Sequence, residues 1–212
     1  MQSTVPDPGT RRRRVPAMAP EERKAALVAA TVPLVRAHGL EVSTRQIADA
    51  AGVAEGTIFR AFPDKASLLR AAVIAAFDPE PLVAELAAAA ATGDLRARLA
   101  AMVDLLRARL GANEPIVAAT RMVAGAPDAQ EFLERLKDAR WRIMAAVAAA
   151  MAPDAGRLRR DPETAARLLF MLVMGTVHRG LGQHNALADL GSDEVVSLLL
   201  DGLLVRTTEE GT

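Results

Sequence analysis

The sequence predicts an all-α protein, and three observations lead to that fold class. Leu, Ala, Arg and Glu, which are good helix formers, recur at helical spacing from Pro20 onward. β-branched residues are scarce, and no segment alternates apolar and polar side chains for long, as a half-buried strand does. Capping residues, Pro and Gly divide the pattern, so we expect about nine helices in a small N-terminal and a larger C-terminal bundle.

The first helix is expected to begin near Pro20, because Pro suits a first helical turn, and to end at Gly39. Pro33 lies inside its apolar stripe and removes a helical hydrogen bond, so we expect a kink or a break there. Residues 1–18 before it contain several helix breakers and the basic run Arg11–Arg14. They are expected to form a flexible arm whose basic run either contacts a polyanion or remains a solvated tail.

Two short helices about a glycine-containing turn are predicted next. Ser43 and Gln46 form a capping box for the first helix, and Gly52 ends it. The second covers Glu55–Phe62, and Asp64 then caps a longer helix. This is the helix-turn-helix arrangement, in which the second helix enters the major groove. Capped helix pairs are common, so the pattern alone leaves a purely structural pair equally open.

Further helices are expected in the remainder of the chain, separated by Pro and Gly. Their expected ranges are Thr92 to about Leu110, Asn113 to near Gly125, Pro127 to about Met151, Asp161 to Gly180 or Gly182, and Ser192 to near Arg206. Glu131 is expected to complete a second capping box at the start of the third of these.

The composition excludes several classes of protein. The 212 residues include no Cys, so disulfides, thiolate metal sites and Cys nucleophiles are absent, which fits a reducing compartment. We therefore expect the cytoplasm. No stretch without Asp, Glu, Lys or Arg exceeds 11 residues, whereas a membrane-spanning helix needs roughly 20 apolar residues, so no membrane partner is expected. The N-terminus lacks the apolar segment of a secretory signal.

A formal net charge of zero conceals an asymmetry along the chain. Residues 1–70 hold 11 basic and 7 acidic side chains, and residues 71–212 hold 15 and 19. The first third is thus the basic part, where a polyanion would bind.

The run STRQIADAAGVAEGTIFRAFPDKASLL, residues 43–69, resembles the DNA-binding signature of the TetR (tetracycline-repressor-like) family. The matching elements are T-x-x-I-A-x-x-A-G-V, G-T-I-F-x-x-F and K-x-x-L-L. The resemblance is strong over residues 19–78. It implies a helix-turn-helix DNA-binding domain over residues 19–66 and a ligand-binding and dimerisation domain over residues 67–212.

The same resemblance implies a set of DNA-binding residues. These are Thr44, Arg45, Glu55, Gly56, Thr57, Phe59, Arg60 and Lys65. Arg60 is the best candidate for a base or phosphate contact, and Lys65 matches the phosphate-binding Lys of the family. Phe59 lacks the hydroxyl of the Tyr common at its position. Ala54 cannot cap the second helix, and Glu55 would repel phosphates unless it meets a cytosine amino group.

The C-terminal bundle suggests a dimer interface and a ligand cavity. The seven apolar residues Leu168–Met174 need more cover than one small bundle gives, and the resemblance implies a homodimer through the last two helices. Gly175 lies next to this run, where its small size would allow close approach. Met and aromatic side chains suit an apolar effector, although ordinary core packing is the alternative for each residue. The candidate ligand-binding residues are Met102, Leu106, Arg121, Trp141, Met144, Phe170, Met174 and His178.

These observations predict a ligand-responsive transcriptional regulator that binds a palindromic double-stranded DNA operator as a homodimer. We expect it to be a repressor. The alternative is a small-molecule or lipid-binding module of the same fold that does not use DNA. An enzyme is not expected, because no catalytic set appears in the sequence. His178 and His184 have the wrong spacing for one helix face, so neither a metal nor a cofactor is expected.

Overall fold

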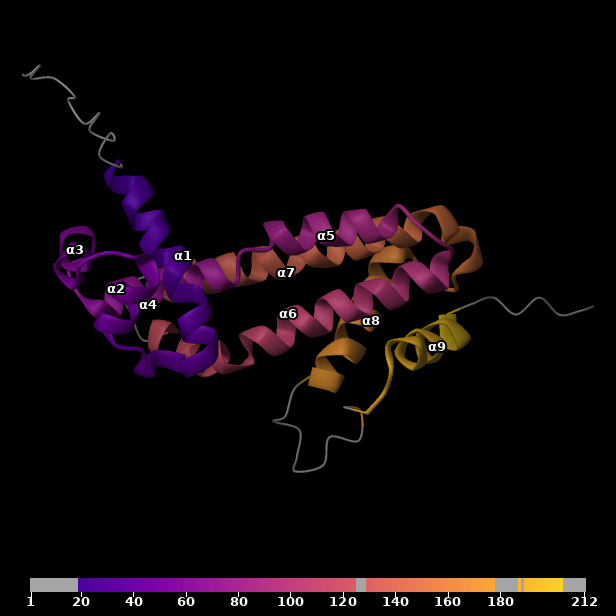
Figure 1. The fold of residues 1–212 in the computed structure, drawn as a ribbon. Helices are drawn as coiled ribbons and strands as arrows, with labels where there is room; N and C mark the ends of the chain where they lie inside the picture. Colours follow the sequence, from indigo (N-terminus) through magenta and orange to yellow (C-terminus); the bar gives the residue numbers. More distant parts are fainter. Residues whose placement is uncertain (1–18, 125–128, 178–186, 188, 204–212) are drawn as a thin grey trace, which may run out of the picture.

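The computed structural model describes residues 19–124, 129–177, 187 and 189–203, and in these ranges it is all-α, as predicted. The helices shown in Figure 1 are α1 Pro20–His38, α2 Thr44–Ala51, α3 Glu55–Ala61, α4 Lys65–Ala76, α5 Glu80–Ala90, α6 Leu95–Ala124, α7 Ala129–Met151, α8 Pro162–Val177 and α9 Ser192–Leu203. Short 3₁₀ turns follow α1 at Gly39–Glu41 and α7 at Ala152–Arg157. None of the described helices is long and apolar enough to cross a membrane.

The N-terminal helices α1 to α4 share one hydrophobic core at one end of the elongated molecule (Figure 1). Leu27 of α1, Ile47 of α2, Ile58 of α3 and Leu68 of α4 are all buried in it. The core continues along α4 beyond residue 66, where the sequence places the end of the DNA-binding domain. Packing thus makes α4 part of the N-terminal bundle, while the boundary itself remains a prediction.

Helix α1 runs through Pro33 without a break. Of the kink or break expected at Pro33, the break does not occur, although Pro33 still removes one helical donor. Thr31 and Val35 on either side of it are buried in the N-terminal core, and the Thr31 hydroxyl donates to the Leu27 carbonyl at 2.7 Å. Burial of this face keeps the helix continuous where local propensity alone would end it.

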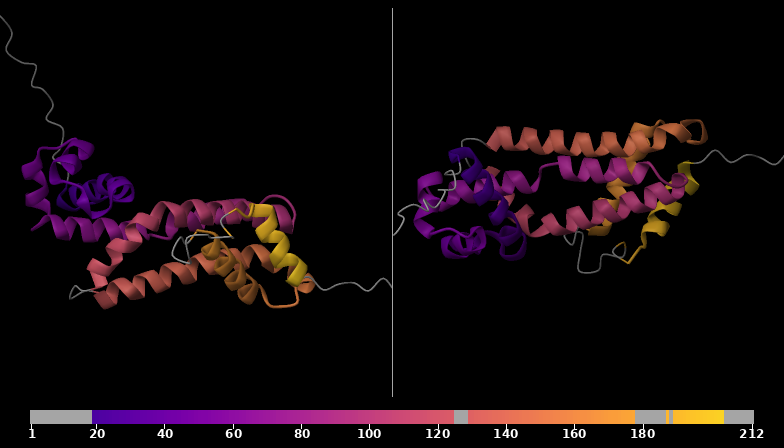
Figure 2. Two further views of the ribbon diagram at one scale, coloured as in Figure 1. Left: turned by 90° about the horizontal axis from the view of Figure 1, so that it is seen from below. Right: turned by 45° about the horizontal axis from the view of Figure 1, so that its top comes forward.

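The C-terminal helices differ from the sequence prediction in two places (Figure 2). One helix, α6, covers the region where two were expected, because Asn113 does not cap a new helix but bonds to other elements of the fold. Helix α5 lies where no helix was predicted. Its start is flanked by Pro79 and Pro81, which mask the helical signal although Pro is tolerated in a first turn.

The helix ends elsewhere agree with the sequence as far as the structure describes them. Asp161 caps α8 by accepting from the Thr164 amide at 2.8 Å, and the Glu194 carboxylate accepts from the Gly191 amide before α9. The predicted capping box at Glu131 lies outside the described residues and side chains, as do the predicted ends of α8 and α9.

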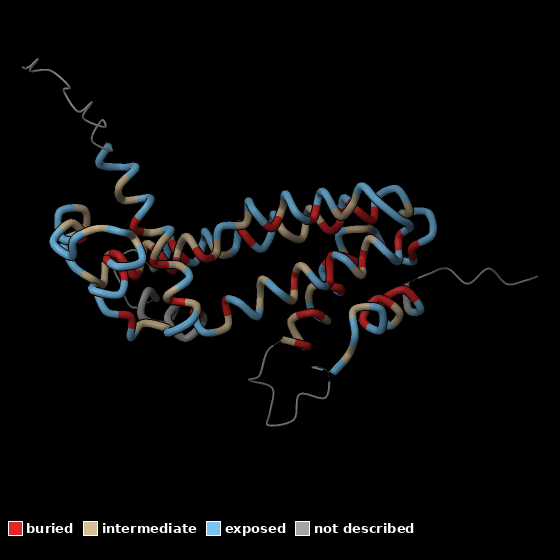
Figure 3. The backbone as a smooth tube through the Cα atoms, viewed as in Figure 1, coloured by how far each residue is buried: buried red, intermediate tan, exposed pale blue. Residues whose placement is uncertain are grey.

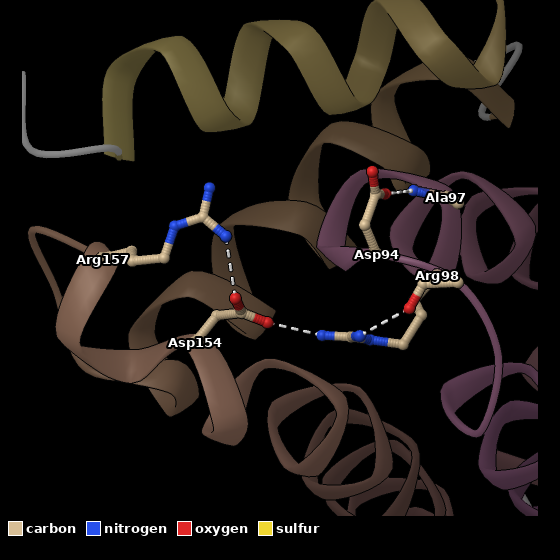
Figure 4. A network of polar contacts seen from close by, with 6 residues as sticks. Asp94, Ala97, Arg98, Asp154 and Arg157 are labelled. Atoms are coloured by element: carbon tan, nitrogen blue, oxygen red, sulfur yellow. Dashed lines mark hydrogen bonds and ion pairs between the residues drawn. The ribbon is translucent and has the colours of Figure 1, made fainter.

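A polar cluster joins the 3₁₀ turn after α7 to the start of α6 (Figure 4). The Asp154 carboxylate accepts from Arg98 of α6 at 2.6 Å and from Arg157 at 2.9 Å. Burial raises the pKa of Asp154, but the hydrogen bonds and charges of Arg157 and Arg98 outweigh it, so that its pKa lies below its ordinary value. The cluster fixes the 3₁₀ turn after α7 against the start of α6.

Candidate nucleic-acid interface and effector cavity

The first helix of the proposed DNA-binding pair begins with the predicted capping box. The Ser43 hydroxyl accepts from the Gln46 amide at 3.2 Å, and Gln46 Oε1 accepts from the Ser43 amide at 2.8 Å. Gly52 ends α2 in the left-handed region with φ +64°, and the Val53 amide donates to the Ala48 carbonyl at 3.0 Å. The cap and the turn therefore form as the sequence predicts.

Buried side chains set the angle between α2 and α3. Ile47 and Ala48 of α2 and Ile58 of α3 are buried in the N-terminal core, with Val53 of the turn packed against it. Ala54 provides no side-chain cap, as expected, so the start of α3 depends on the core for its position. A recognition element held by core packing presents its outer residues in a fixed orientation.

The outer face of α3 is open to solvent (Figure 3). Glu55, Gly56 and Arg60 are exposed, and the Phe59 side chain is 52% exposed, although a large apolar residue of this kind is usually buried. Thr57 is half-buried beside them. Five of the predicted DNA-binding residues thus lie on one helix at the end of the molecule, and four of them are exposed.

The remaining predicted residues flank α3. Arg45 is exposed on α2, and Lys65 is half-exposed at the first position of α4. The adjacent Asp64 carboxylate accepts from the Ser67 amide at 2.6 Å, and this bond, followed by the Ser67 hydroxyl contact, lowers the pKa of Asp64. Asp64 is thereby used as a helix cap, while Lys65 supplies the cation next to the first amides of α4.

Sequence reasoning missed one contact in this region. The Thr44 hydroxyl donates to the Glu55 carboxylate, joining the start of α2 to the start of α3. The eleven-residue separation of the two residues gave no local signal for this bond. Thr44 is therefore engaged within the protein, and Glu55 carries its negative charge at the edge of the same surface.

The comparisons with known proteins agree with this geometry. Residues 27–72 match the family model described as bacterial regulatory proteins, tetR family. The chain carries the N-terminal domain of the TetR family. No curated protein matches its sequence.

Solved structures extend the likeness to the whole TetR fold. A TetR-family transcriptional regulator from Mesorhizobium loti is 19% identical, with a TM-score of 0.64 over 89% of this chain and 100% of its own. A transcriptional regulator from Rhodococcus sp. is 23% identical, with a TM-score of 0.60 over 90% and 100%. One from Pseudomonas aeruginosa is 26% identical, with a TM-score of 0.57 over 88% and 92%.

Inside the C-terminal half of this TetR fold lies a cavity of about 280 Å³. Its walls come from the end of α4 and from α5, α6, α7 and α8. Its lining is mostly apolar, and the apolar residues are Ala76, Phe77, Leu82, Leu106, Leu110, Leu136, Ala139, Ile143, Phe170, Met174 and Val177. The volume is near the lower end of the range for small-molecule sites, roughly 300–1,000 Å³.

The predicted ligand-binding residues do not all reach this cavity. Leu106, Phe170 and Met174 line it. Met102 is fully buried in the C-terminal core, and Trp141 and Met144 line a separate surface groove between α7 and the start of α8. The remaining two, the Arg121 side chain and His178, lie outside the described part of the structure.

Polar residues at one part of the cavity wall were not found from the sequence. Asn113 of α6 is buried and lines the cavity, and its side chain donates to the Ala76 carbonyl at 3.0 Å and accepts from Arg36 of α1 at 3.1 Å. The spacing of Leu106, Leu110 and Asn113 is that of one helix face, which is the signal that would have found it.

Arg109 lines the same cavity. Burial and, after it, the positive charge of Arg109 lower the pKa of Arg36. Among the described residues, no cluster of His, Asp or Glu could hold a metal ion.

Proposed function

We propose that this chain is a homodimeric, ligand-responsive transcriptional regulator, most simply a repressor, that reads a palindromic operator. The exposed outer face of α3, held on a buried core, carries the proposal. In this reading α3 of each protomer enters one major groove, with Arg60 donating to a base edge or phosphate and Lys65 to the backbone. Gly56, which has nothing within 4 Å of its missing Cβ on the protein side, leaves room for the DNA backbone.

Exposed apolar side chains support the dimer. Leu168 and Met171 of α8 and Leu198 of α9 face solvent in the single chain, and Met171 is 68% exposed. The run Leu168–Met174 is thus only partly covered, since Leu169 and Val173 enter the core while its other face stays open. A second copy would cover it. Gly175, by contrast, faces Leu187 of the same chain, whose Cδ1 lies 3.2 Å from the position of a Cβ.

The position of the cavity supports a ligand response. Ala76 and Asn113 belong both to the cavity wall and to the contacts that join α6 to α1 and α4. An effector that binds more tightly to one arrangement of this wall would shift the population of the dimer toward that arrangement and so change the spacing of the two α3 helices. The free energy of this shift cannot exceed the difference in the effector's binding free energy between the two arrangements. The carboxyl-terminal helices would fix that spacing in the dimer.

The proposal is tested by selecting DNA fragments that the full-length protein retains from a random duplex pool. Enrichment of a palindrome with half-site centres about one helical turn apart, roughly 34–36 Å, or a multiple of it, supports DNA reading by a twofold dimer. Failure to enrich any sequence at low salt, where backbone contacts are strongest, would favour a TetR-fold binding module without DNA.

A further inference from the structure

We propose that the cavity between α4 and α8 takes a small amphipathic anion, a carboxylate on an apolar body, whose charged group binds Arg109. This deepens the proposed function, because it assigns a chemical class to the effector of that regulator.

The first observation is a positive charge on the cavity wall that has no bonded partner among the described residues. Within the described part of the chain, the half-buried Arg109 guanidinium makes no hydrogen bond and no ion pair. Arg36 is close enough for the Arg109 charge to lower its pKa, and Arg36 itself donates to two neutral acceptors, Asn113 Oδ1 and the Ala76 carbonyl. Two guanidinium groups that repel each other in partly desolvated surroundings are relieved by a bound anion.

The other charged groups on the cavity wall are already used or exposed. Asp78 is exposed, and its carboxylate accepts from the Glu80 amide at 3.2 Å at the start of α5. Glu114 is engaged in an interaction of its own, and Arg140 is exposed. Arg109 therefore remains as the half-buried cation on the described wall that is available to a ligand.

The rest of the cavity suits an apolar body of modest size. Leu106, Phe170 and Met174 lie on its wall together with aliphatic side chains of α5 and α7. An apolar neutral ligand would fill this part but leave Arg109 unpaired, and a fully polar ion would leave the apolar part unfilled. An amphipathic carboxylate would pair its charged group with Arg109 and fill the apolar part of the cavity with its tail.

The test compares octanoate with 1-octanol, which share an apolar tail and differ in charge, by isothermal titration calorimetry on the full-length protein without DNA. We expect octanoate to bind about tenfold or more tightly than 1-octanol, because a charge-assisted hydrogen bond contributes at least that factor. R109Q should lose this advantage, R109K should retain part of it, and K137Q, which removes an exposed charge outside the cavity, should not change binding. Equal affinity for the two probes, no binding of octanoate, or unchanged octanoate binding by R109Q would overturn the proposal.

A second measurement does not depend on variants. In NMR spectra of protein labelled with ¹³C-methyl Met, octanoate should change the chemical shift of Met174, which lies on the cavity wall. The chemical shift of Met151, which is buried elsewhere in the C-terminal core, should stay unchanged. An unmoved Met174 signal at saturating octanoate would overturn the site. Because neither experiment contains DNA, its failure leaves the proposed DNA binding standing, and failure of the DNA selection leaves the ligand class standing.

Discussion

Arg36 of α1 donates to the side chain of Asn113 of α6 at 3.1 Å, and this bond connects the helix-turn-helix bundle to the wall of the cavity. Asn113 also donates to the Ala76 carbonyl at the end of α4. A single buried carboxamide thus contacts two helices of the N-terminal bundle, α1 and α4. We expect it to carry the ligand signal between them.

Replacement of Asn113 by Ala should therefore have two effects. The free energy of unfolding, measured by urea denaturation, should fall by about 1–3 kcal/mol, because buried polar partners lose their bonds. The effect of effector on DNA affinity should also shrink. Ser197→Ala is the matched control, since it removes an exposed bond from Arg96 and should change stability by no more than about 0.5 kcal/mol. Full effector response in the Asn113 variant would contradict the coupling role.

Gly56→Ala separates stability from DNA binding. Position 56 is helical and a Cβ there meets nothing within 4 Å, so Ala should raise the free energy of unfolding by about 0.5–1 kcal/mol. The same methyl should weaken DNA binding if the backbone of α3 approaches the duplex closely. Gly52→Ala should instead destabilise the protein by about 1–2 kcal/mol, because position 52 has φ +64°. A G56A variant that binds DNA as tightly as the parent would show that close approach is not needed.

The Asp154 cluster predicts a pH-dependent contribution to stability. The pKa of Asp154 is lowered in the folded state, so its carboxylate stabilises the fold above the unfolded-state pKa, about 3.9, and loses this effect as pH falls through the folded-state value. The difference in free energy of unfolding between wild type and Asp154→Asn should be constant from neutral pH to about that value and then shrink. A difference independent of pH across this range would contradict the role given to Arg98 and Arg157.

Met171→Glu tests the interface on α8. Placing a charge at this exposed apolar position should shift the protein from dimer to monomer in sedimentation equilibrium, because the charge would lose its hydration in the interface. Leu133→Glu is the matched control, as Leu133 is an exposed apolar residue on α7. If both variants remain dimeric, the interface lies elsewhere.

Local signals explain what the sequence could predict. The capping box at Ser43 and the positive φ at Gly52 depend on neighbours in the chain, and both formed as predicted. The continuation of α1 through Pro33 and of α6 through Pro115 depends on packing between distant segments, which no local pattern contains.

The same distinction applies to the sites. The predicted DNA-binding residues fall within a short continuous segment, and the structure places them around one end of the molecule. The wall of the cavity is formed by five helices. Leu106 and Met102 are one turn apart on α6, yet Leu106 lines the cavity whereas Met102 is buried in the core. The roles proposed for Arg109 and Asn113 depend on their proximity to Arg36, which lies more than seventy residues earlier in the chain.

Arg60→Ala tests the central claim, that the exposed face of α3 binds the major groove, most directly. On a duplex selected by the wild-type protein, measured by fluorescence anisotropy, the variant should bind more weakly by about 1–3 kcal/mol, with the loss confined to the preferred sequence if Arg60 reads a base. Lys137→Ala, at an exposed position of α7, serves as the charge control. Wild-type affinity in the Arg60 variant on the selected duplex would contradict the claim.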